Sequence, residues 1–105
     1  MVTRRNELQA RVFQALGHPL RLAIVELLRD GEVCVCDIAE RVGSERSNVS
    51  RHLAVMLQAG VLSSRKQGLQ VFYSLRIPCI TEFLCCATRV VSHNLEESSR
   101  ALAGA

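Results

Sequence analysis

The cysteines are the residues of this sequence whose type and spacing could do chemistry. The chain of 105 residues has five of them, and Cys34 and Cys36 stand one residue apart at the start of a predicted helix. A helix N-terminus favours the thiolate form of cysteine, which binds metal ions and reacts with oxidants. We therefore expect Cys34 and Cys36 to bind a soft ion. The alternative is that both are small hydrophobic core residues.

Helix geometry sets a condition on such a site. Residues two apart in a helix point about 200° apart, so one ion reaches both thiolates only if the first turn loosens. Cys79 and Cys86 share a face of a predicted last helix but lie ~10 Å apart along its axis, too far for one ion. Either Cys79 or the adjacent Cys85 and Cys86 could meet Cys34 and Cys36, across the fold or across a dimer. Cys79 is our first choice for the third ligand, and Cys85 or Cys86 is the alternative.

A second set of chemically useful residues follows a tight turn at Gly43. Residues 33–60 read as two short helices, each with apolar residues at three- and four-residue spacing. Ser44 is the predicted N-cap of the second helix. Two helices around a short glycine-containing turn are typical of a helix-turn-helix, whose second helix enters the major groove of DNA. We refer to residues 33–60 as the helix-turn-helix segment.

The polar face of the second helix is the predicted DNA-reading surface. Arginine can pair with guanine, asparagine with adenine, and serine with bases or phosphates. His52 is interpreted as a phosphate or packing contact rather than a metal ligand, because no second ligand stands at helical spacing from it. The residues assigned to DNA on this helix are Arg46, Ser47, Asn48, Ser50, Arg51 and His52.

The positive charge of the chain is concentrated where DNA contact is expected. The net charge is only +3, yet residues 44–76 carry five basic residues against Glu45 alone, a net of +4. Arg65 and Lys66 belong to this excess and are assigned to the DNA backbone. Charge alone is equally compatible with a solvated surface.

The remaining segments predict the frame of the molecule. Helices are expected over residues 5–16 and 19–29, and a β-hairpin over residues 61–76 with a basic tip. A long helix over residues 78–101 follows. The predicted fold is mainly α with a small β-hairpin, in the order α-α-α-α-β-β-α. A helix-turn-helix followed by such a hairpin, the wing, is a winged helix.

The last helix predicts self-association. Its apolar stripe is broader than a small core needs, so we expect a dimer through the first and last helices. The alternative is that this helix packs across its own domain. A two-fold axis would set two reading helices one turn of DNA apart, ~34 Å. The stripe consists of Ile80, Phe83, Leu84, Ala87, Val90, Val91 and Leu95.

Composition and motifs exclude several classes of protein. A hydrophobic content of 49% favours one globular domain, residues 1–105, over disorder. No apolar run approaches the ~20 residues of a membrane helix, and the N-terminus lacks a signal-peptide pattern. We expect a cytoplasmic protein with reduced thiols. No catalytic motif is visible, so an enzyme is not expected.

These features together resemble the ArsR/SmtB family of metal- and metalloid-responsive winged-helix repressors. The resemblance spans about residues 8–95 and rests on four stretches: ALGHPLRLAIVELL, EVCVCDIAERVG, SNVSRHLAVMLQAGVLSSRKQG and VFYSL. It implies a homodimer that binds double-stranded operator DNA and releases it when an ion binds. The Cys-Val-Cys-Asp element is similar to the inducer site of arsenite- and cadmium/lead-sensing members.

The sequence departs from the family patterns in three ways. Arsenite sensors often carry a further cysteine where this chain has Ala39, and cadmium/lead sensors use cysteines from an N-terminal arm, which this chain lacks before Cys34. Zinc sensors carry a set of metal ligands on the last helix, and this chain has other residues at the matching positions. Three thiolates suit As(III) or Sb(III), which we rank first as inducer, with Cd(II) or Pb(II) second. The positions of the zinc-sensor set hold Ile77, Cys79, Val90 and His93.

Two other functions fit the same residues. The cysteines could form a thiol redox sensor, oxidised between Cys34 or Cys36 and the cysteines of the last helix. The winged helix could also be a protein-interaction module without a regulatory role, which absence of salt-dependent DNA binding would indicate.

Overall fold

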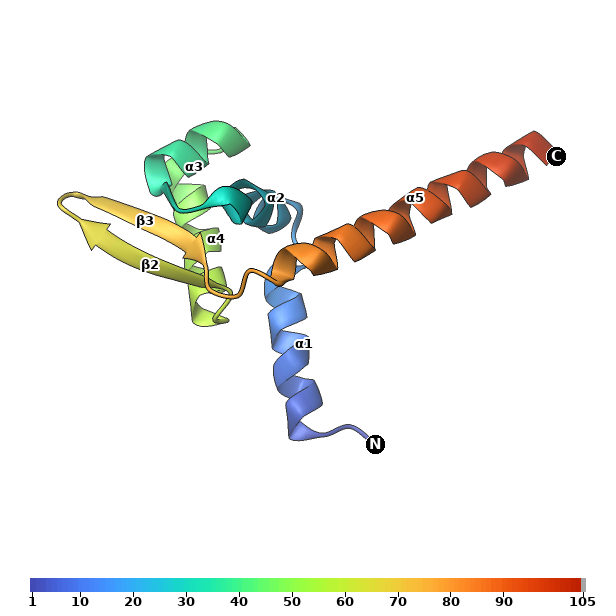
Figure 1. The fold of residues 1–105 in the computed structure, drawn as a ribbon, viewed down its shortest axis with the longest axis horizontal. Coiled ribbons are helices and arrows are strands. Elements are labelled where there is room, and N and C mark those ends of the chain that lie inside the picture. The colour runs from blue at the N-terminus through green and yellow to red at the C-terminus, as the bar shows by residue number, and fades with distance from the viewer. Residues whose placement is uncertain (105) are drawn as a thin grey trace.

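Four helices enclose the core of the molecule. The computed structural model describes residues 1–104, with α1 at Arg4–Leu16, α2 at Pro19–Leu27, α3 at Val35–Val42 and α4 at Arg46–Gln58 (Figure 1). The second predicted helix ends earlier than expected, because residues Leu28–Asp30 form a short 3-10 helix, η1. The core is made by Ile24, Val25, Leu28, Val35, Ile38, Ala39, Val49, Leu53, Met56, Val61, Leu62 and Ile80.

A small antiparallel sheet closes one side of this core. Strands β2, Leu62–Gln67, and β3, Gln70–Leu75, form the predicted hairpin. A third strand, β1 at Val33–Cys34, pairs with β3 and gives the order β1-β3-β2. Strand β1 was not predicted from the sequence. Two residues are too few to show the alternation that marks a strand, so β1 is defined by its partner β3.

The turn between α3 and α4 differs by one residue from the expected one. Gly43 adopts a left-handed conformation (φ 68°) and ends α3, as the sequence indicates. The N-cap of α4 is Glu45 rather than Ser44, so that prediction was wrong. The Ser44 amide donates to the Ala39 carbonyl at 3.1 Å and so belongs to the end of α3. Its hydroxyl accepts from Asn48 Nδ2 at 2.9 Å.

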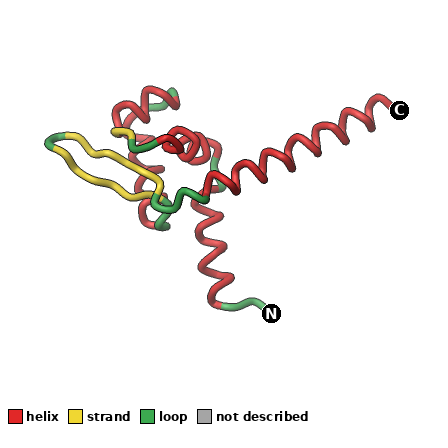
Figure 2. The backbone as a smooth tube through the Cα atoms, in the orientation of Figure 1, coloured by secondary structure: helices red, strands yellow, loops and turns green. Residues whose placement is uncertain are grey.

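The last helix, α5, runs over Ile80–Gly104 and leaves the body of the protein on the side opposite the hairpin (Figures 1 and 2). It begins two residues after Pro78, whose carbonyl accepts from the amide and the hydroxyl of Thr81. The expected start at residue 78 was therefore too early. Only Ile80 and Leu84 of α5 pack on the core. No helix within residues 1–104 is both long and apolar enough to cross a membrane.

Large apolar side chains are exposed on both α1 and α5. Phe13 and Phe83 pack edge to face with ring centroids 6.1 Å apart, yet both remain more than half exposed. The last helix therefore does not pack across its own domain beyond its first turns. The exposed apolar residues of these two helices are Leu8, Phe13, Phe83, Val90, Val91, Leu95 and Leu102. We call them the α1/α5 apolar surface.

Candidate DNA-binding surface and cysteine site

Helix α4 presents a polar face opposite its buried face. Val49, Leu53 and Met56 have no exposed surface and hold the helix on the core. Because helical neighbours lie three and four residues apart, the opposite face carries the predicted DNA contacts. Those exposed to solvent are Arg46, Ser47, Ser50 and Arg51.

Asn48 connects the loop before α4 to Arg51, which lies one helical turn further along α4. Its amide nitrogen donates to Ser44 Oγ at 2.9 Å, and its amide oxygen accepts from Arg51 Nη2 at 3.3 Å. Asn48 is only half exposed. It therefore orients Arg51 in the free protein, and it keeps one amide hydrogen and one oxygen lone pair for an adenine.

His52 is a packing residue in this structure. Arg21 Nε of α2 donates to His52 Nδ1 at 3.1 Å, and the His18 ring lies 4.4 Å from the His52 ring. Burial lowers the pKa of His52, and the nearby charges of His18, Arg21 and Arg51 lower this pKa further. Packing was one of the two interpretations given for His52.

The wing carries the two basic residues assigned to the DNA backbone, in different surroundings. Arg65 donates to both carboxylate oxygens of Glu32 and to Gln67 Oε1, and its guanidinium lies 4.8 Å from the centre of the Phe72 ring. The bond with Arg65 lowers the pKa of the exposed Glu32 carboxyl. Lys66 follows Arg65 on the strand and so points to the opposite face. Glu32 therefore competes with phosphate for Arg65.

Cys34 and Cys36 lie where the sequence predicts, at the start of α3. Cys34 is the N-cap residue and makes no side-chain capping bond, and Cys36 is in the first turn. Cys34 also belongs to β1, where it pairs with Phe72 of β3. Cys34 is buried and Cys36 is exposed. One thiol thus faces the interior beside the wing and the other faces solvent.

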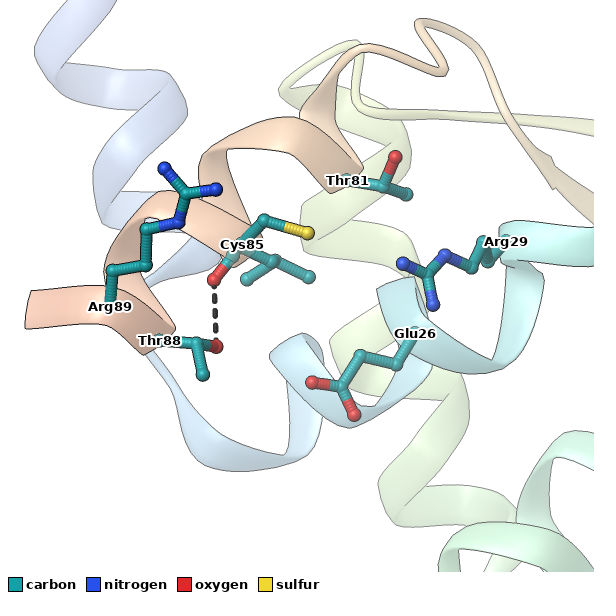
Figure 3. Close-up of a pocket in the computed structure, with 7 residues that line it drawn as sticks. Glu26, Arg29, Thr81, Cys85, Thr88 and Arg89 are labelled. Atoms are coloured by element: carbon teal, nitrogen blue, oxygen red, sulfur yellow. Dashed lines mark hydrogen bonds between the residues drawn. The ribbon is translucent and has the colours of Figure 1, made fainter. Parts of the chain in front are cut away.

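The three cysteines near α5 lie in different surroundings. All three are exposed. Cys79 lines an apolar hollow against α1, together with Val12 and Phe13. Cys85 lines an open cavity of about 420 Å³ between α5 and the α2–η1 segment, together with Glu26 and Arg29 (Figure 3).

These placements leave the predicted ligand set incomplete within one chain. Among residues 1–104, no three side chains of the histidine, cysteine, aspartate or glutamate type gather closely enough to hold an ion. Cys34, Cys36 and Cys79 therefore stay a predicted set, with Cys85 and Cys86 as the alternatives for the third position.

Sequence reasoning missed two residues that organise the site. Glu32 is 33 positions from Arg65, and Arg21 is 31 positions from His52. In the sequence, each looks like an ordinary charged residue on a solvated surface. The sequence offered one sign of the role of Glu32, which is that Glu32 directly precedes the helix-turn-helix segment.

Comparison with known proteins places this site in a family. A family model described as "Bacterial regulatory protein, arsR family" matches residues 18–64, which include α2, α3 and α4. The HTH-type transcriptional regulator Rv0081 of Mycobacterium tuberculosis is 37% identical over 92 residues, 87% of this chain and 81% of that protein. The arsenical resistance operon repressor of Escherichia coli K12 is 42% identical over 69 residues, 65% of this chain and 59% of that protein.

Solved structures show the same fold. The crystal structure of Rv0081 has a TM-score of 0.78 and 35% identity, and it covers 91% of this chain and 97% of that chain. The solution structure of Mb0332 from Mycobacterium bovis, a homodimeric winged helix-turn-helix DNA-binding domain, has a TM-score of 0.77 and 26% identity. It covers 92% of this chain and 93% of that chain. This chain therefore belongs to the ArsR family of winged helix-turn-helix transcriptional regulators.

Proposed function

We propose that this protein is a transcriptional repressor that binds double-stranded operator DNA as a homodimer and releases it when arsenite or antimonite binds cysteine thiolates. The observation that carries the proposal is the position of Cys34 and Cys36 at the start of α3. This helix is the first of the helix-turn-helix segment, so an ion bound there acts directly on the DNA-reading unit.

The DNA-binding part rests on the surface of α4 and the wing. Arg46 and Arg51 project from the face of α4 opposite the core, and Lys66 is exposed on the wing. Arginine at the start of a reading helix suits guanine, and lysine on a wing suits phosphate.

The dimer rests on the α1/α5 apolar surface. Phe83 is 55% exposed and Val90 is 59% exposed, which is uncommon for large apolar residues repeated along one helix. A second copy of the chain would cover them. The homodimeric state of Mb0332, whose chain has the same fold, supports this assignment.

The ion-binding part rests on donor chemistry. Thiolates are the soft ligands that bind As(III) and Sb(III), and Cys34 and Cys36 supply two of them. In our proposal the third comes from Cys79, the residue before α5, and otherwise from Cys85 or Cys86 of α5. Because one chain does not bring three donors together, the third comes from the other subunit or from a rearrangement within the chain.

Release of DNA follows from the strain that a shared ion would impose on α3. Cys34, the N-cap with an extended backbone, is buried, whereas Cys36, the second helical residue, is exposed, so their side chains point in different directions. Drawing both to one ion unwinds the first turn of α3. The turn is continuous with Ile38 and Ala39, which pack in the core with α4. Its movement therefore displaces the reading helix.

Two other inducers use the same cysteines. Cd(II) and Pb(II) also bind thiolates and are the second choice of ion. A thiol redox sensor would instead respond to peroxide without an ion. All of these require reduced thiols at rest, which fits a cytoplasmic location.

The test is release of promoter DNA by serine variants of the reduced protein. Cys34→Ser and Cys36→Ser should bind the DNA as the wild type does but lose release by arsenite. Serine at the exposed position 64, on β2, offers no thiol, so Ser64→Ala is the matched control and should respond as the wild type. Unchanged release in both cysteine variants would contradict the proposal.

A further inference from the structure

Arg21 connects three helices of the DNA-binding unit. Its Nη1 donates to the carbonyl of Ala15 in α1 at 3.2 Å, and its Nε donates to His52 Nδ1 in α4 at 3.1 Å. Arg21 itself belongs to α2 and is half-buried. A single side chain therefore fixes the reading helix against the end of α1.

A second histidine completes this junction. His18 is the N-cap of α2, and its Nδ1 accepts from the amide of Leu20 at 3.1 Å. The His18 and His52 rings lie 4.4 Å apart, with 48° between their planes. Both imidazoles thus use Nδ1 as a hydrogen-bond acceptor, which is possible only while that nitrogen carries no proton.

The charges around the pair are basic. His52 faces Arg21 and His18 from the α2 segment and Arg51 on its own helix. From α1, Arg11 lines the same hollow as Arg21. Burial lowers the pKa of His52, and the charges of His18, Arg21 and Arg51 lower this pKa further, so the neutral ring is the favoured form.

Protonation removes the interaction that Arg21 makes with α4. A proton on His52 Nδ1 turns the acceptor into a donor and sets a cation against the Arg21 guanidinium. The proton therefore breaks a bond at the junction where α4 meets the rest of the fold.

We propose that His52, held by Arg21 and packed against His18, forms a proton-sensitive brace that positions the reading helix, so that acidification weakens binding to operator DNA. This inference rests on the proposed binding of DNA through α4. Its sign is distinctive, because added positive charge alone would strengthen contact with phosphates.

The experiment is fluorescence anisotropy of the reduced protein on its own promoter DNA from pH 8 to 5.5 at constant ionic strength. Wild-type affinity should fall by roughly three- to tenfold towards acid pH, the range that loss of one hydrogen bond spans. His52→Gln keeps an acceptor for Arg21 that does not titrate, so the DNA affinity of this variant should stay constant or rise as the pH falls. His93→Gln is the matched control, because His93 is an exposed histidine on α5, and it should follow the wild type.

Two results would overturn the brace. One is a wild-type affinity that rises steadily as the pH falls, and the other is the same pH profile for the wild type and His52→Gln. Both require binding at pH 8, so they are distinct from failure of the proposed function, where no binding occurs at any pH.

A second measurement keeps the inference testable if His52→Gln does not fold. Nitrogen NMR of the wild type without DNA should show Nδ1 of His52 unprotonated at neutral pH. Titration of His52 should then shift the signal of Arg21 Nε. A protonated Nδ1 at neutral pH, or an Arg21 signal that ignores the titration, would contradict the brace.

Discussion

Arg65 of the wing and Glu32, the residue before β1, form an ion pair across 33 positions of sequence. Arg65 Nε lies 2.8 Å from Glu32 Oε2, and Nη2 of the same guanidinium contacts Oε1. Glu32 stands two residues before Cys34, which pairs with Phe72 beneath the Arg65 guanidinium. The proposed ion site and the wing are therefore in direct contact through β1 and β3.

This ion pair predicts a gain of DNA affinity when Glu32 is neutralised. Glu32→Gln removes a carboxylate that competes with phosphate for Arg65, so operator affinity should rise by roughly threefold and the salt dependence should steepen by up to about one unit of slope. Anisotropy at several salt concentrations measures both. Glu97→Gln, at an exposed position on α5, is the control. An unaltered salt slope would show that Arg65 does not reach DNA.

The same pair predicts a pH dependence of stability. The pKa of Glu32 is lowered from 4.5 in the folded protein by its bond with Arg65. The stability that the ion pair gives to the folded protein is therefore complete above pH 4.5 and disappears as the pH falls through the lowered pKa of Glu32. The difference in thermal unfolding between the wild type and Glu32→Gln should follow this course. A difference that persists below the lowered pKa would contradict it.

The α1/α5 apolar surface predicts that a charge at Phe83 breaks the dimer. Phe83→Asp places a carboxylate where we expect a second copy, so the dimer dissociation constant should rise by about a hundredfold or more. Sedimentation equilibrium measures this change. Leu69→Asp makes a similar change at the hairpin turn, where Leu69 is 98% exposed, and should leave the dimer intact. A dimer that tolerates Phe83→Asp would exclude this surface.

The third thiolate can be identified by single substitutions of the cysteines in and just before α5. Of Cys79→Ser, Cys85→Ser and Cys86→Ser, we expect Cys79→Ser to lose release of DNA by arsenite while DNA binding is retained. X-ray absorption should show three sulfur neighbours of arsenic in the wild type and two in the defective variant. If Cys85→Ser or Cys86→Ser is defective instead, the third ligand is reassigned. If all three respond as the wild type, none of these three thiolates binds the ion.

Local patterns in the sequence predicted most of the fold. Gly43 ends α3 in a left-handed conformation, and the apolar spacing from Val49 to Met56 defines the buried face of α4. Each depends on residues within a few positions of one another. The two-residue strand β1 was missed because its pairing with Tyr73 and Phe72 is a tertiary contact.

The site was less predictable than the fold for the same reason. Helical periodicity predicts that Arg46 and Arg51 lie on the exposed face of α4. The partners of Arg65 and His52, by contrast, come from segments more than 30 positions away. Sequence spacing places Cys34 and Cys36 together at a helix start but does not determine which cysteine of the last helix joins them.

The central claim is that an ion bound at Cys34 and Cys36 releases DNA. Its most direct test is anisotropy of the reduced wild-type protein on its own promoter DNA, titrated separately with arsenite, cadmium, zinc and peroxide. We expect salt-dependent binding that arsenite reverses at stoichiometric concentration and that peroxide does not. Release by peroxide alone would contradict it in favour of thiol oxidation, and absence of DNA binding would contradict the repressor function itself.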